Sequence, residues 1–257
     1  MVAILKYFKE QFDLILQLTK TSFKLRNEGS YLGIAWYLLN PLLIFLVLYL
    51  VFAKRMGADI EHYGLYLLLG LIVWNFLSLT TTTAMNNLLS NSMLIKSLNF
   101  KRESLIISSI MMGLVSHFFE IFVFLFFLFF FGIKPFLIIL YPLILILLSL
   151  FALGLSFILS SLVVYFRDLN NIWVFVSRVW WFATPIFYSI NQDSGLIYRI
   201  NLFNPMYYFL DASRDLLIYS KLPQLNSLII LLSFSIGSFI LGHLIFKKLK
   251  NKFAELT

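Results

Sequence analysis

Six long, strongly apolar runs constrain the fold of this chain more than any other feature of its sequence. A bilayer core is about 30 Å thick and an α-helix rises about 1.5 Å per residue, so about 20 apolar helical residues cross it. Each run has about that length or more, which predicts an all-α integral membrane protein with six transmembrane helices. The predicted spans are Ile34–Phe52, Tyr63–Thr83, Leu105–Phe131, Phe136–Phe166, Ile172–Ile190 and Leu225–Phe246.

The composition agrees with a membrane protein and excludes several other classes. Apolar residues make up 61% of the 257, and charged residues only 12%, about half the share of a soluble protein. There is no cysteine, which excludes disulfide frameworks, zinc ribbons, iron–sulfur clusters and thiol nucleophiles. None of the 11 glycines is followed by Lys, so the phosphate-binding G-x-x-x-x-G-K-[ST] loop is absent. We expect no cofactor or metal on this chain; if ATP powers it, ATP and Mg²⁺ bind a partner.

The basic residues predict the orientation in the membrane. Thirteen of the 20 Lys and Arg residues lie in the N-terminal stretch, the second and fourth connections and the tail, whereas six lie in the alternate connections. Loops rich in Lys and Arg stay in the cytoplasm, so both ends of the chain are predicted to be cytoplasmic. The net charge of +8 indicates contact with anionic headgroups of membrane lipids rather than with nucleic acid.

Residues 1–30 are predicted to form an amphipathic helix rather than a signal peptide. Leu5, Phe8, Phe12 and Leu16 recur at helical spacing with charged residues between them. Such a helix lies in the headgroup region on one side of the bilayer. The alternative is a helix that merely anchors the chain.

Two cytoplasmic connections have patterns that suit a partner. In Asn86–Ser104, apolar residues recur at helical spacing among polar ones, which predicts a short helix on the membrane surface with one face available. In the fourth connection, Arg167 and Asp168 place opposite charges side by side. The alternative for this pair is an ordinary helix start, where the helix dipole favours Asp168.

The last outer connection, Asn191–Gln224, is too polar to span and too aromatic for a solvated loop. Non-helical backbone at membrane depth is tolerated where it lines a cavity or is buried in protein. We therefore predict one or two short re-entrant helices around Pro205. The chain then forms a single membrane domain: an interfacial helix over 1–30, spans 1–5 over 34–190, the outer segment 191–224, the last span over 225–246 and a tail over 247–257.

Charges inside the predicted spans are scarce, and each one needs a partner or water. Glu120 lies in the third span one turn after His117, and Arg178 lies in the fifth. We expect Glu120 to pair with His117 or Arg178 in the protein interior, either as a structural tie or in a channel. Counted along the helices, Glu120 lies about 22 Å from its span's start and Arg178 about 10 Å, which disfavours Arg178 as the partner.

Small residues spaced by four are expected to let helices pack closely. The fourth span carries three of them, Ala152, Ser156 and Ser160, and the sixth carries Ser233 and Gly237.

Four motifs, in this order, resemble those of the permeases of ABC-2-type exporters, in particular the polysaccharide-export permeases of the Wzm type. The resemblance covers nearly the whole chain. The motifs are Arg26-Asn27-Glu28-Gly29-Ser30-Tyr31-Leu32-Gly33-Ile34-Ala35-Trp36 with Asn40-Pro41; Leu94-Ile95-Lys96 through Phe100-Lys101-Arg102-Glu103; Tyr165-Phe166-Arg167-Asp168 with Thr184-Pro185-Ile186-Phe187-Tyr188; and Asn204-Pro205 with Arg214-Asp215. Asn27 and Lys101 depart from the family pattern, in which Tyr and Pro are usual.

The resemblance implies half of a homodimeric channel with one P-loop ATPase subunit on each copy. It implies ATPase coupling through Asn91, Met93, Leu94, Lys96, Phe100, Arg102, Glu103, Arg167 and Asp168, and an outer gate at Asn204, Pro205, Tyr207, Tyr208, Arg214 and Asp215. A glycan path needs aromatic faces and hydroxyl groups, for which Trp36, Tyr37, Trp74, Thr80, Thr83, Trp173 and Trp181 are candidates. Interfacial anchoring or packing is the alternative for each aromatic residue.

The sequence therefore predicts a multi-pass permease of the bacterial inner membrane that exports a lipid-linked polysaccharide, in particular O-antigen. Export of capsule, teichoic acid or a drug is the nearest alternative. A secondary transporter would show inverted repeats, and no internal symmetry of that kind is found. An enzyme would need convergent acid–base or metal-binding residues, and His117–Glu120 is the only histidine pairing at usable spacing.

Overall fold

The computed structural model describes residues 2–27, 31, 33, 35–57, 60–97, 100–190, 195–250 and 253. Within these ranges the regular structure is entirely helical, which confirms the predicted all-α class. The elements are α1 (Val2–Asn27), α2 (Ala35–Met56), α3 (Tyr63–Ser90), α4 (Ser92–Ser97), α5 (Glu103–Phe130), a 3₁₀ turn η1 (Ile138–Leu140), α6 (Tyr141–Tyr165), α7 (Leu169–Ala183), α8 (Leu196–Leu202), α9 (Pro205–Leu217) and α10 (Leu225–Leu249).

Five segments of the described chain are long and apolar enough to cross a membrane, which makes this a multi-pass membrane protein. They are Leu39–Met56, Tyr63–Ser90, Glu103–Phe130, Ile138–Tyr165 and Leu225–Leu249. Each corresponds to one of the predicted spans. Helix α3 is the most buried of the five and packs against α2, α5 and α6.

The predicted fifth span, Ile172–Ile190, is shorter in the structure. Its helix, α7, has 15 residues and ends at Ala183, which is about 22 Å of helix. Pro185 explains the end of the helix, because the residue before a proline is pushed out of the helical region, and Thr184 is extended.

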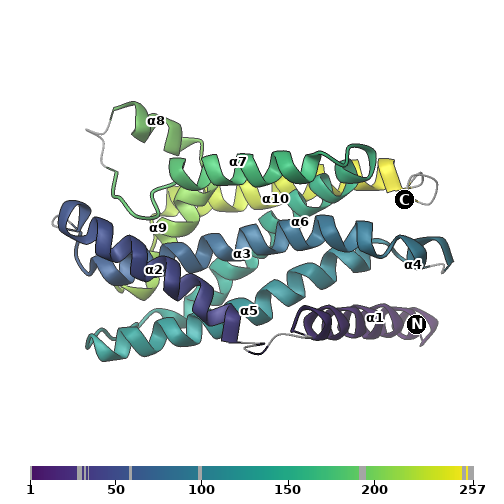
Figure 1. Cartoon of the computed structure of the whole chain (residues 1–257), viewed down its shortest axis with the longest axis horizontal. Coiled ribbons are helices and arrows are strands. Elements are labelled where there is room, and N and C mark those ends of the chain that lie inside the picture. Colours follow the sequence, from purple (N-terminus) through teal and green to yellow (C-terminus); the bar gives the residue numbers. More distant parts are fainter. Residues whose placement is uncertain are drawn as a thin grey trace.

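The helices run lengthwise and define two ends of the molecule (Figure 1). One end carries α4, the turn between α6 and α7, and the end of α10; we call it the α4 end. The other carries α8, α9 and the connection between α2 and α3; we call it the α9 end. The start of α1 also lies at the α4 end.

The connections differ in detail from the predictions. Helix α3 continues to Ser90, so the short helix expected within Asn86–Ser104 is reduced to α4. The segment before the last span does contain two short helices, α8 and α9, and Pro205 occupies the first position of α9. Proline suits that position because its missing N–H has no helical partner there.

Helices α6 and α10 pack most closely at two glycines. A Cβ added at Gly242 would lie 2.2 Å from the carbonyl oxygen of Gly154, and Ser238 donates a hydrogen bond to the Phe151 carbonyl at 3.0 Å. The predicted role of Gly237 and Ser233 was wrong: nothing lies within 4 Å of a Cβ at Gly237, and Ser233 is exposed. A four-residue spacing does not say which face of a helix meets its neighbour.

Candidate functional site

A groove of about 500 Å³ lies between α2, α3 and α7. It combines indole rings with amide and hydroxyl groups, and it contains one arginine. The lining residues are Asn40, Pro41, Ile44, Leu71, Trp74, Asn75, Ser78, Thr82, Val174, Ser177, Arg178, Trp181 and Phe182. This mixture suits a ligand that has both apolar faces and hydroxyl groups, as sugars do.

Two of the predicted path residues, Trp74 and Trp181, line this groove. The ring of Trp74 packs edge-on against Trp180, 5.4 Å between centroids. The indole of Trp173 is buried and donates to the Thr81 hydroxyl at 3.2 Å. Of the predicted glycan-path residues, Trp74 and Trp181 therefore line the groove, whereas Trp173 is buried in the packing behind it.

The other predicted path residues lie elsewhere. Thr80 is fully buried and its hydroxyl donates to the Phe76 carbonyl at 2.7 Å, whereas Thr83 is half-buried. Trp36 is about half exposed, at 49%, near the start of α2. The side chain of Tyr37 lies outside the described part of the chain.

The predicted intramembrane tie centres on Glu120, which is buried. Asn75 donates to its carboxylate at 2.5 Å, and the Nδ1 atom of His117 lies 3.9 Å from the other carboxylate oxygen. His117 is held in turn by the Tyr141 hydroxyl, 2.8 Å from its Nε2 atom. Arg178 is not part of this cluster, because it lies exposed on α7 and lines the groove. The sequence did not identify Asn75, which connects the cluster to the groove.

At the α9 end, Asn204 joins three helices. It caps α9 by accepting from the Met206 N–H at 3.1 Å, and the same oxygen accepts from the Trp180 indole of α7 at 2.8 Å. Its amide nitrogen donates to the Thr184 hydroxyl at 3.0 Å and to Asn201 of α8 at 2.9 Å. The start of α9 is thereby fixed to the end of α7.

Arg214 of α9 is buried between α3 and the turn after α7. Its guanidinium donates to the carbonyls of Ile186 at 3.1 Å and Tyr66 at 3.3 Å, and it stacks 3.3 Å above the Tyr66 ring. Gly70 leaves the necessary room, because a Cβ there would lie 2.9 Å from the guanidinium. The hydroxyls of Tyr63 and Tyr66 bind the same turn, at the carbonyls of Phe187 and Tyr188, each at 2.9 Å.

The remaining predicted gate residues lie around this arginine. Tyr208 is buried and donates to the Leu202 carbonyl at 3.0 Å. Burial and the nearby Asp211 raise the pKa of Tyr207 to about 12. Burial, together with Asp211, also raises the pKa of Asp215 to about 6. The predicted gate residues are therefore grouped on one short helix.

At the α4 end, the last turn of α10 is tied to the start of α5. The Lys250 ammonium lies 2.6 Å from the Glu103 carboxylate, and Arg102 donates to the Lys250 carbonyl. Phe253 is fully buried and packs against Phe246, 5.5 Å between ring centroids. The sequence did not identify the contacts of Lys250 or the burial of Phe253, because no local pattern distinguishes these two residues from their polar neighbours in the sequence.

The other residues of the predicted coupling segment differ in burial at this end. On α4, Ile95 is buried while Met93 and Lys96 are exposed. Phe100 packs against the hydrophobic cluster that contains Ile95, Phe246 and Phe253. Asn91 follows the end of α3, and its side-chain amide donates to the Asn87 carbonyl at 2.8 Å. The side chain of Leu94 lies outside the described part of the chain.

Arg167 and Asp168 are exposed in the turn between α6 and α7. Asp168 occupies the N-cap of α7 without a side-chain cap. Both charged side chains are therefore accessible on the surface of the α4 end.

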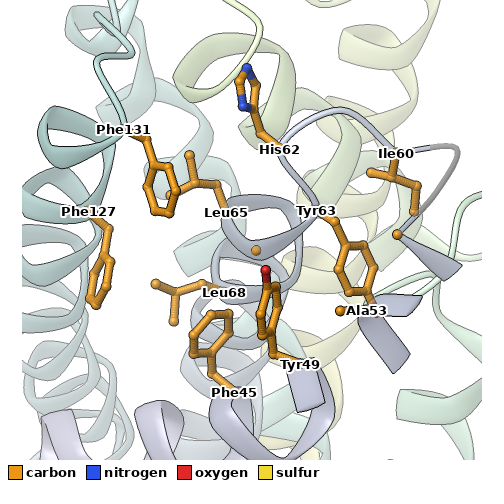
Figure 2. Close-up of a pocket in the computed structure, with 12 residues that line it drawn as sticks. Phe45, Tyr49, Ala53, Ile60, His62, Tyr63, Leu65, Leu68, Phe127 and Phe131 are labelled. Carbon is orange, nitrogen blue, oxygen red and sulfur yellow. The ribbon is translucent and has the colours of Figure 1, made fainter. Parts of the chain in front are cut away.

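A second cavity, of about 410 Å³, lies near the α9 end between α2, α3 and α5. Figure 2 shows Phe45 and Tyr49 on one side of it, Phe127 and Phe131 on another, and His62 above. Its walls are largely aromatic and aliphatic, so it suits apolar groups better than hydroxylated ones.

Comparison with known proteins agrees with this architecture. Residues 13–218 match the family model described as ABC-2 type transporter, so the chain belongs to that family. It is similar to two proteins from Klebsiella pneumoniae named O-antigen export system permease protein RfbA, each 31% identical over 95% of both chains. A protein of the same name from Myxococcus xanthus is 26% identical over 99% of both chains.

Proposed function

We propose that the chain is the membrane subunit of an ABC exporter that moves a lipid-linked O-antigen polysaccharide across the bacterial inner membrane. The observation that carries this proposal is the similarity to O-antigen export permeases over nearly the full length of both chains. In this proposal the chain acts as a homodimer with two copies of a separate ATPase subunit, which binds ATP and Mg²⁺.

In this arrangement α7 crosses the membrane as a sixth span together with the turn that follows it. Both ends of the chain are cytoplasmic, α1 lies in the inner headgroup region, and the α4 end faces the cytoplasm. The distribution of Lys and Arg supports this orientation.

The groove between α2, α3 and α7 forms one half of the glycan path. An exposed arginine at membrane depth is costly against lipid, so the face that carries Arg178 needs water or a protein cover. The two outer helices of the groove also carry exposed hydrophobic residues, which are Phe175, Val179 and Phe182 of α7 and Leu43 and Val47 of α2. A second copy packed against these residues encloses the groove and keeps Arg178 hydrated.

The two ends of the molecule then have different tasks. At the α4 end, the exposed Met93, Lys96, Arg167 and Asp168 offer contacts to an ATPase. At the α9 end, α8 and α9 are re-entrant and close the path, and the Asn204 and Arg214 contacts hold them closed. Movement of α7 reaches this gate through Trp180 and the turn at Thr184, to which Asn204 is bonded.

Deletion of the gene tests the function directly. We expect lipid-linked O-antigen to accumulate on the cytoplasmic face and to disappear from the cell surface, and both defects to be reversed by the wild-type chain. A deletion strain with a normal amount of surface O-antigen would refute the proposal.

The coupling role is tested separately with Arg167→Ala/Asp168→Ala. We expect this double variant to retain ATP hydrolysis in the purified complex but to export little glycan. The matched control, Arg55→Ala/Glu61→Ala, also removes one basic and one acidic side chain, both exposed beside the connection between α2 and α3, and should leave ATP-dependent export unchanged. Normal export by the Arg167/Asp168 variant would exclude the assigned role.

A further inference from the structure

Arg178 is the single charged residue among those that line the groove between α2, α3 and α7. Its side chain is exposed, and it forms no ion pair with the part of the chain that the structure describes. Its neighbours in the groove are amides, hydroxyls, indoles and aliphatic groups. The groove therefore carries a positive charge that this protomer does not neutralise.

The carboxylate of Glu120 is hydrogen-bonded to a groove residue but does not itself line the groove. It is 2% exposed, and Asn75 separates it from the groove by donating its amide N–H to the carboxylate. His117 lies on its other side, 3.9 Å away. Glu120 thus fixes the amide of Asn75, while Arg178 sets the sign of the potential at the groove surface.

We infer that this groove binds anionic groups of the transported molecule, that is, a carboxylate or a phosphate on the moving chain. This inference rests on the proposed function and names the substrate class of the same groove. A guanidinium binds both anions through paired N–H donors. The hydroxyl and amide side chains nearby can form hydrogen bonds with the uncharged hydroxyl groups of a sugar. The indoles of Trp74 and Trp181 offer apolar faces to the rest of a sugar ring.

The absence of cysteine from the sequence permits a test that does not depend on the identity of the substrate. Ser177 lines the groove beside Arg178, so Ser177→Cys gives this chain a single thiol, placed in the groove, and the modification of this chain is followed. The full-length variant, in membranes with its ATPase partner, is treated with two methanethiosulfonate reagents, one bearing a sulfonate and one a trimethylammonium group. Each rate is divided by the rate of the same reagent with a free thiol in solution.

We expect the normalised rates to favour the sulfonate reagent by about tenfold. One unit charge about 6 Å away in water-like surroundings changes the local anion and cation concentrations by about threefold each, in opposite directions. Arg178→Gln should abolish this preference, and Arg178→Lys should retain it. Equal normalised rates with Arg178 present, or no reaction with either reagent, would overturn the inference.

Met56→Cys is the control for the thiol's position. Met56 is exposed at the last residue of α2, beside the connection between α2 and α3. It does not line the groove. We expect its thiol to show no preference that depends on Arg178; a preference lost equally at both positions on Arg178→Gln would contradict a local effect.

Export in cells then separates the two sources of the anion. Arg178→Gln is compared in strains that make a neutral polymer and a uronic-acid polymer on the same lipid anchor. Loss of the acidic polymer alone identifies sugar carboxylates, and a similar loss of both identifies the phosphate of the anchor. Normal export of both would overturn the inference. The proposed function fails independently if the wild-type chain exports neither polymer, whatever the thiol rates show.

Discussion

Arg214→Ala is expected to destabilise the α9 end strongly. The substitution removes two hydrogen bonds from a charged donor, worth about 1.5–3 kcal/mol each, and a buried stacking contact with Tyr66, worth about 2 kcal/mol. It also removes the cost of burying a guanidinium, which is several kcal/mol. The net loss is then about 2–4 kcal/mol, or roughly 10 °C in the midpoint of thermal unfolding.

The assay is thermal unfolding of the purified full-length protein in detergent. The control is Arg199→Ala, the same substitution at an exposed arginine of α8, which should change stability by less than about 0.5 kcal/mol. Equal effects of the two substitutions would refute the reasoning, because they would show that the buried contacts of Arg214 contribute nothing specific.

A second substitution tests whether the loss of stability comes from the contacts of Arg214 or from a general disturbance of the fold. Gly70→Ala places a methyl group 2.9 Å from the Arg214 guanidinium and 3.1 Å from the Ile186 carbonyl. We expect Gly70→Ala to lower stability less in the Arg214→Ala background than in the wild type, because the stability effects of substitutions at two residues in direct contact are not additive. Strict additivity would contradict the geometry in which Gly70 makes room for Arg214.

Three further predictions concern other parts of the molecule. Glu103→Lys and Lys250→Glu should each lower stability by about 1 kcal/mol, and the double exchange should recover only part of it, since it restores the ion pair but places Lys at the start of α5 and Glu at the end of α10, where the helix dipoles disfavour them; failure of both single variants to change the unfolding midpoint would exclude the pair. Asn204→Ala should cost about 2–4 kcal/mol, because it removes the cap of α9 and the acceptor of the partly buried Trp180 indole N–H, while Asn204→Asp, which keeps the oxygen that accepts both bonds, should cost less. Folding raises the pKa of Asp215 from 3.8 to about 6 and so favours its protonated form; stability from this group is lost as pH rises through about 6, so Asp215→Asn should match the wild type near pH 4 and exceed it in thermal stability above pH 6, and a constant difference across that range would rule out the titration.

The helices were predictable because their signals are local. Apolar length alone located the five candidate spans, and Pro205 with its polar and aromatic neighbours indicated short helices before the last one. Pro185 also carried a local signal, but the predicted fifth span ran through it. The lesson is that hydropathy identifies a membrane segment without fixing where its helix ends.

The contacts of the site were less predictable because they join residues far apart in the chain. Arg214 binds carbonyls of Tyr66 and Ile186, which are 148 and 28 residues away. The motif resemblance named Arg214 but did not name its partners. For Glu120, the depth of each residue along its helix correctly disfavoured Arg178, yet the sequence did not indicate the hydrogen bond from Asn75, because an amide on a neighbouring span has no distinguishing pattern.

The glycine contact between α6 and α10 limits how the molecule can move. With Gly154 and Gly242 in contact at the backbone, neither helix slides or rotates against the other without first separating from it. Helix α10 also packs against α9 near one end and holds Glu103 through Lys250 at the other. The pair therefore forms one rigid unit that connects the two ends of the molecule.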